Sequence, residues 1–179
     1  MTDREGAFKL CIFGDGGVGK TTLVNRYLTS VFDETLKMTI GADFYVKDLE
    51  IDGKKVVNRI WDFGGEQRFK VLLPSFAKGA DGGIFMYDIT RYTSIKNIDD
   101  WLSIFEKNTR DKQINIPIVM VGGKLDLQEK RSVETEGAIE LSEKHNLQGY
   151  YECSSKTGET VEEVFESITR KMMKSTNLI

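Results

Sequence analysis

The sequence predicts one α/β domain, a three-layer sandwich in which a mostly parallel six-stranded sheet with one antiparallel hairpin strand lies between helices. Short apolar runs alternate with amphipathic runs of helical spacing, as strands and their covering helices do along a parallel sheet. The length of 179 residues, 40% of them hydrophobic, suits a single domain with its own core. We therefore expect residues 1–179 to form one domain.

The first half of the chain contains one strand, one helix and one hairpin. Asp52-Gly53 is a strong hairpin signal and separates two strand-like runs, which we expect to pair as antiparallel neighbours. The elements expected here are a strand at Phe8–Phe13, a helix at Lys20–Thr29, and strands at Ala42–Ile51 and Lys54–Trp61.

The second half repeats strand and helix. Gly83–Tyr87 and Ile116–Val121 are continuous apolar runs, typical of parallel strands that are buried on both faces. A short strand is expected at Tyr150–Cys153. Helices are indicated by three apolar sets, namely Ile95, Ile98, Trp101, Leu102 and Phe105; Ala138, Ile139 and Leu141; and Val161, Val164, Phe165 and Ile168.

Composition excludes several classes of protein. The net charge of −3 and the absence of a basic stripe argue against nucleic-acid binding. The apolar runs are shorter than a membrane span requires, and Met1-Thr2-Asp3 begins neither a signal peptide nor a myristoylation site. The spacing of Cys11 and Cys153 matches neither a metal site nor a disulfide framework, and we expect the side chain of His145 to be solvated. A cytoplasmic protein without a membrane span is expected.

A phosphate-binding loop follows the first strand. The segment Gly14-Asp15-Gly16-Gly17-Val18-Gly19-Lys20-Thr21 matches G-x-x-x-x-G-K-[ST] between a strand and a helix. Its glycines let successive backbone N–H groups turn inward around phosphate oxygens. Lys20 is expected to pair with the β- and γ-phosphates, the Thr21 hydroxyl to bind Mg²⁺, and Thr22 to line the same site. The fold class is therefore that of P-loop NTPases.

A carboxylate and a glycine follow the strand at Lys54–Trp61. Asp62 stands at the strand end, where a carboxylate can hold the magnesium shell. Gly65 leaves a backbone N–H able to approach a γ-phosphate. The alternative for Asp62 is an ordinary capping residue before a loop.

Two further motifs follow later strands, Lys124-x-Asp126 and Ser154-Ser155-Lys156. The ordered set of motifs resembles the Ras superfamily of small GTPases across Phe8–Met173. The segments that look most like the Rab family are Thr39-Ile40-Gly41-Ala42-Asp43-Phe44, Ile60-Trp61-Asp62, Arg68-Phe69 and Met86-Tyr87-Asp88-Ile89-Thr90.

The resemblance implies how a guanine base is recognised. Asp126 would accept hydrogen bonds from the guanine N1–H and exocyclic amine, a donor pair that adenine lacks. The implied supporting contacts are the stem of Lys124 over the purine, Ser154 orienting Asp126, the N–H of Ser155 on the guanine O6, Lys156 beside the ring and Phe32 over the base edge.

The resemblance also implies a switch. Thr39 would join Thr21 and Asp62 around Mg²⁺ only when a γ-phosphate is present, so residues 31–41 and 63–76 become the two switch regions. The implied ligands are GTP or GDP with Mg²⁺. Effectors, GTPase-activating proteins (GAPs) and exchange factors are the implied partners at the switch regions, and a monomer is expected.

The chain departs from the family pattern at the catalytic position. The family has Gln then Glu after Gly65, whereas this chain has Glu66 then Gln67. A carboxylate cannot donate a hydrogen bond to the γ-phosphate and repels it, so slow hydrolysis is expected unless Gln67 takes over. The alternative is that the exchange only decorates an exposed loop. The catalytic set expected from the sequence is Lys20, Gly65, Glu66 and Gln67.

Further departures concern nucleotide retention. Gly123 stands where the family has Asn. The replacement removes the hydrogen bonds of the Asn side chain, worth about 1 kcal/mol each. We therefore expect the loop that binds the guanine base to be looser and the nucleotide to be released faster. Leu36 replaces a common tyrosine over the γ-phosphate, and residues 31–38 contain no arginine that could act in cis.

The last residues, 175–179, contain no cysteine for prenylation. We expect either truncation or membrane contact through a partner.

Three functions fit these features. The first is a switch that binds GTP, hydrolyses it slowly and recruits effectors. The second is a non-catalytic GTP-binding scaffold, favoured by Glu66 and Gly123. The third, a nucleotide kinase, leaves Lys124-x-Asp126 unexplained and lacks an arginine cluster for an acceptor.

Overall fold

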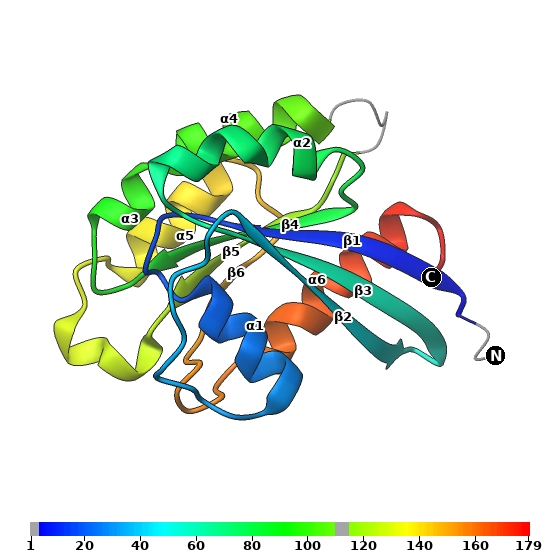
Figure 1. Ribbon diagram of the computed structural model, residues 1–179, viewed down its shortest axis with the longest axis horizontal. Helices are drawn as coiled ribbons and strands as arrows, with labels where there is room; N and C mark the ends of the chain where they lie inside the picture. Colours follow the sequence, from blue (N-terminus) through cyan, green and yellow to red (C-terminus); the bar gives the residue numbers. More distant parts are fainter. Residues whose placement is uncertain (1–3, 110–114) are drawn as a thin grey trace.

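The sheet has six strands in the order β2-β3-β1-β4-β5-β6 (Figure 1). The computed structural model describes residues 4–109 and 115–179. All neighbouring strands are parallel except β2 and β3, which form the antiparallel hairpin. The strands are β1 Gly6–Phe13, β2 Ala42–Ile51, β3 Lys54–Phe63, β4 Gly82–Asp88, β5 Ile118–Gly123 and β6 Tyr150–Glu152. The predicted fold class is confirmed.

Helices cover both faces of this sheet (Figure 1). One layer consists of α1 Lys20–Thr29 and α6 Val161–Ser175. The other consists of α2 Leu73–Ala77, α3 Thr93–Lys96, α4 Ile98–Thr109 and α5 Thr135–Lys144. Two 3₁₀ segments, η1 Gln67–Leu72 and η2 Leu125–Lys130, lie in the loops.

The core is divided by the sheet into two clusters. Along β1, Leu10 and Ile12 face the cluster under α1 and α6, whereas Cys11 and Phe13 face the cluster under α2 to α5. This division follows from the two-residue period of a strand. Both faces of the central strands β4 and β5 are therefore buried under helices.

Several predicted boundaries change in the structure. β3 and β4 run further than predicted, to Phe63 and Asp88, and β5 begins and ends two residues later, at Ile118–Gly123. These residues have strand partners that local apolarity does not reveal, Ala42 for Phe63 and Gly123 for Asp88. The predictions on residues 1–3 lie outside the described residues.

The prediction for His145 is wrong. Its side chain is only 17% exposed, and its Nε2 lies 3.3 Å from a carboxylate oxygen of Asp99 on α4. The residue directly after α5 is brought against α4, a contact between neighbouring helices that the local charged sequence did not indicate.

Within the described ranges, no helix combines the length and apolarity that crossing a bilayer requires.

Candidate nucleotide-binding site

The candidate site lies where the parallel strands end. The loops after β1, β3, β4, β5 and β6 leave the sheet at their carboxyl ends, the edge where open α/β sheets bind ligands. Two adjacent cavities open there, and both are lined by Gly19, Thr22 and Lys124. A ligand with two chemically different ends can therefore occupy both at once.

The first cavity, of about 220 Å³, surrounds the loop between β1 and α1. Lys20 is 6% exposed, and its Nζ donates to the carbonyl oxygens of Gly14 and Asp15, both at 2.8 Å. Burial lowers the pKa of Lys20 to about 8, although the nearby carboxylates of Asp62 and Asp15 act in the opposite direction. This enclosed ammonium is a binding point for an anion such as phosphate.

The side chain of Asp15 does not face this cavity. Its two carboxylate oxygens accept hydrogen bonds from Asn97 Nδ2 at 2.8 Å and Trp101 Nε1 at 2.9 Å. Trp101 is buried on α4. Asp15 therefore fastens the phosphate loop to α4, and only its backbone remains available for the predicted nucleotide contact.

Three oxygen atoms meet beside Lys20, and all belong to the predicted metal ligands. Thr21 Oγ1 lies 2.6 Å from Thr39 Oγ1, and both hydroxyls donate to Asp62 Oδ2, Thr39 from 3.3 Å. Asp62 is fully buried, and no residue in the described part of the chain forms a hydrogen bond with its Oδ1. Burial raises the pKa of Asp62 to about 6, against the lowering effect of the two hydroxyls and Lys20.

The second cavity, of about 330 Å³, lies between the loops after β5 and β6. Asp126 lines it, and Ser154 Oγ donates to Asp126 Oδ1 at 2.7 Å. Ser154 is fully buried, so it fixes the carboxylate in one orientation. The structure also brings the predicted base-side residues Phe32, Ser155 and Lys156 to this cavity, together with Val18.

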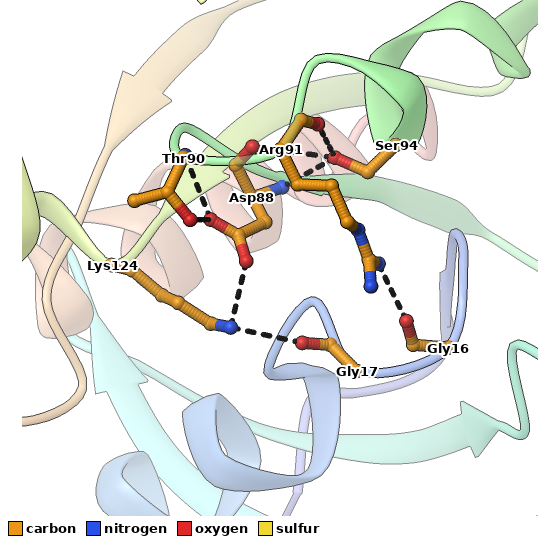
Figure 2. A network of polar contacts seen from close by, with 7 residues as sticks. All are labelled: Gly16, Gly17, Asp88, Thr90, Arg91, Ser94 and Lys124. Carbon is orange, nitrogen blue, oxygen red and sulfur yellow. Dashed lines mark hydrogen bonds and ion pairs between the residues drawn. The ribbon is translucent and has the colours of Figure 1, made fainter. Parts of the chain in front are cut away.

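Lys124 lines both cavities, and Figure 2 shows its side chain between Asp88 and Gly17. Its Nζ forms an ion pair with Asp88 Oδ2 at 2.7 Å and donates to the carbonyl oxygen of Gly17 at 3.1 Å. Despite burial, the hydrogen bond from Lys124 and those from Thr90 hold the pKa of Asp88 below its usual range. The sequence predicted the position of Lys124 but not this anchoring of its charge.

A polar network beneath the base loop was missed by the sequence reasoning. Arg131 donates to both carboxylate oxygens of Glu152, at 2.8 and 2.7 Å, and Tyr150 donates to the same carboxylate at 2.6 Å. Burial acts to raise the pKa of Glu152, but the hydrogen bonds from Arg131, Tyr150 and Thr135 and the charge of Arg131 together outweigh it and leave that pKa below its usual value. This network joins the segment after η2 to β6, whose last residue, Glu152, lies two positions before Ser154.

Gly123 is the last residue of β5 and is buried, so it belongs to the strand rather than to the loop that follows; the expected faster nucleotide release stays a prediction. A Cβ atom on Gly123 would lie 2.5 Å from Cε of Met86 and 3.2 Å from the carbonyl oxygen of Val18. Met86 is 1% exposed and lines the second cavity. A buried thioether therefore fills the space that a larger residue at 123 needs.

This packing predicts that Gly123 and Met86 are coupled. Gly123→Asn alone is expected to destabilise the fold by about 1–3 kcal/mol because the new side chain overpacks against Met86. Combining it with Met86→Ala is expected to recover at least half of that loss and to slow GDP release, since contacting positions are not additive. Denaturant unfolding and the dissociation rate of a fluorescent GDP measure both effects. Strictly additive stability changes would contradict the coupling.

The segment after β3 closes over the phosphate loop. Gly16 N donates to the carbonyl oxygen of Gly65 at 3.1 Å, and a Cβ on Gly65 would collide with backbone atoms of Asp15 and Gly16. Gly65 lines the phosphate cavity as predicted, but through its carbonyl it occupies the N–H of Gly16.

The two predicted water-positioning residues do not reach this cavity in the structure. Glu66 forms an ion pair with Arg68 at 2.7 Å, and Gln67 is exposed at the start of η1. Neither side chain is among the residues that line the cavity within the described part of the chain. Their catalytic roles stay predictions.

The buried lysine in a glycine loop, the converging hydroxyls and carboxylate, and the second cavity with its fixed acid define a P-loop nucleotide-binding protein. The sequence model of the Ras family matches residues 9–174. Human Ras-related protein Rab-19 is 38% identical over 171 residues, covering 96% of this chain and 77% of the relative. Dog Ras-related protein Rab-13 is 36% identical over 166 residues, covering 93% and 80%.

The chain belongs to the Ras family and is a Rab-like small GTPase. Membership makes it a GTP-binding switch protein and a GTP hydrolase, with guanine nucleotide as its ligand and with effectors, GAPs and exchange factors as partners.

Proposed function

We propose that this chain binds GDP or GTP with Mg²⁺ across the two cavities, hydrolyses GTP slowly and recruits effectors in membrane traffic or signalling. The proposal rests on the observation that the phosphate-side and base-side cavities are adjacent and share lining residues. Gly19, Thr22 and Lys124 line both, with Lys20 in the first and Asp126 in the second. A nucleoside diphosphate has a matching anionic end and base end.

The oxygen cluster supports Mg²⁺ as the resident ion. Thr21, Thr39 and Asp62 supply two hydroxyls and one carboxylate, the hard ligands that Mg²⁺ takes together with phosphate oxygens and waters. The buried Oδ1 of Asp62, which has no hydrogen-bond partner among the described residues, fits a site that is completed by a cation. The ion would neutralise charge on the β- and γ-phosphates. The protein's own contribution is to orient these oxygens beside Lys20.

The position of Thr39 supports a conformational switch, because Thr39 belongs to the first predicted switch region, residues 31–41. It lies in the segment between α1 and β2, and its hydroxyl touches Thr21 of the phosphate loop. The second region, 63–76, touches the same loop through Gly65. Ligands that favour or oppose these contacts would order or release both segments, and this order–disorder change is how effectors distinguish nucleotide states.

Slow hydrolysis is the finer part of the proposal. Glu66 is held by Arg68 outside the cavity, and its carboxylate has no hydrogen to donate. Positioning of water and γ-phosphate then rests on Lys20 and the loop backbone. The same observation favours the second candidate, a scaffold that binds GTP without hydrolysing it.

Glu66→Gln separates the two candidates. If the protein is a slow enzyme, the new amide can donate a hydrogen bond to the γ-phosphate, and the ion pair of residue 66 with Arg68 is lost. The rate of single-turnover phosphate release is then expected to rise about fivefold, which corresponds to one hydrogen bond. The exposed exchange Glu129→Gln is the matched control. If neither the wild type nor Glu66→Gln releases phosphate over many hours with Mg²⁺, the scaffold is the correct reading.

The nucleotide itself is tested by direct titration. Purified, nucleotide-stripped protein is expected to bind GDP with Mg²⁺ at least 100-fold more tightly than ADP, because only guanine offers a donor pair to Asp126, an effect of about 3 kcal/mol. Equal affinity for both nucleotides would end the guanine proposal.

A further inference from the structure

Arg91 reaches the phosphate loop from the turn after β4 (Figure 2). Its Nη2 donates to the carbonyl oxygen of Gly16 at 2.6 Å. The arginine backbone is held in place, since its N–H donates to the carbonyl of Asp88 at 3.0 Å and its own carbonyl accepts Ser94 Oγ at 2.6 Å. The backbone of Arg91 is therefore fixed, and its guanidinium points toward the phosphate loop.

Two successive carbonyls of the loop accept hydrogen bonds from two different cations. Arg91 binds the carbonyl of Gly16, and Lys124 binds that of Gly17 at 3.1 Å. The charge of Lys124 is balanced by Asp88 at 2.7 Å. No carboxylate in the described part of the chain forms an ion pair with Arg91, which is half-buried. The carbonyl of Gly16 is thus its principal polar partner.

These contacts fix which way the peptide groups of the loop face. The described chain contains no cis peptide bond, and in a trans peptide the N–H points opposite to the carbonyl. With the carbonyls of Gly16 and Gly17 turned to the cations, the N–H groups of Gly17 and Val18 point away from them. Gly17 has φ +74°, and glycine passes between such conformations at little cost. Without a partner on the carbonyl, these peptides would be free to flip.

We propose that Arg91 is a positioning residue that locks the Gly16–Gly17 peptide in the orientation that presents N–H groups to the nucleotide's phosphates. Arg91 is not among the described residues that line the phosphate cavity, so it acts through the loop rather than on the ligand. The inference rests on the proposed binding of a diphosphate in this loop. It adds a residue from the β4–α3 turn, outside the G-x-x-x-x-G-K-[ST] motif, to phosphate recognition.

The test compares phosphate-dependent with phosphate-independent binding. Affinities for GDP and for guanosine are measured by isotope-edited NMR titration in wild type, Arg91→Gln, Arg91→Lys and Arg59→Gln. Arg59 is an exposed arginine on β3 and serves as the charge-matched control. Amide signals of Gly17 and Val18 are followed in the same titrations, because a residue that merely stabilises the fold would not shift them selectively.

Arg91→Gln is expected to weaken GDP about tenfold, the worth of one charge-assisted hydrogen bond, while guanosine affinity stays within twofold. Its amide signals at Gly17 and Val18 should move before ligand is added, and Arg91→Lys should recover at least a third of the lost affinity. Unchanged GDP affinity, or equal losses for GDP and guanosine, would overturn the role of Arg91 and leave the proposed function intact. Failure of the wild type to bind GDP would overturn both.

Discussion

Asp126→Asn is expected to move the base preference from guanine to xanthine. Ser154 Oγ donates to Asp126 Oδ1 at 2.7 Å, so an asparagine would keep its carbonyl on the serine and turn its amide toward the base. Guanine would then meet a donor where it needs an acceptor. Losing the paired contacts should weaken GDP by about 100-fold or more, while xanthosine diphosphate gains a donor for its additional carbonyl.

Competition between GDP and xanthosine diphosphate for each purified variant measures this exchange. Glu129→Gln, the same change of carboxylate to amide on an exposed position of η2, should bind GDP like the wild type. An Asp126→Asn protein that still prefers GDP would show that the Asp126 carboxylate does not recognise the guanine base.

Lys20→Ala is expected to remove nucleotide binding almost completely. The ammonium is buried, and its pKa of about 8 leaves it mostly charged at neutral pH. Charge-assisted hydrogen bonds to phosphate in such a site contribute about 1.5–3 kcal/mol each, so losing two should weaken GDP about 1,000-fold.

Calorimetric titration with GDP gives the affinity, and circular dichroism checks that the variant is folded. Lys54→Ala, which removes a half-exposed lysine at the far end of the hairpin strand, is the control and should retain wild-type affinity. A folded Lys20→Ala protein within tenfold of wild type would place the phosphates elsewhere.

The fold and the main residues of the site were predictable because their signals are local. The glycine loop, the hairpin turn Asp52-Gly53 and the apolar runs each show their structure within a few residues. Lys20 and Asp126 lie far apart in the chain, yet both follow strands of one parallel sheet, and this topology alone brings them to the same edge.

The remaining parts of the site depend on packing between segments that no local pattern connects. Nothing in the sequence around Arg91 or Met86 indicates that these side chains reach Gly16 and Gly123. Asp15 occupies a freely variable position of the loop motif, so the motif does not say that its side chain faces α4. The helices α2 and α3, of five and four residues, are shorter than a periodic pattern can reveal.

The hydrogen bond between Trp101 and Asp15 also gives the molecule an intrinsic optical probe. The chain has two tryptophans, and the other, Trp61, lies among the rings of Phe44 and Phe76 on the hairpin side. Indole emission responds to nearby dipoles, so the unlabelled protein emits from both places at once. Exchanging Trp61 for phenylalanine would leave Trp101 as the fluorophore, which contacts both Asp15 of the glycine loop and Lys70 of η1, so ligand exchange at this loop could be followed in real time.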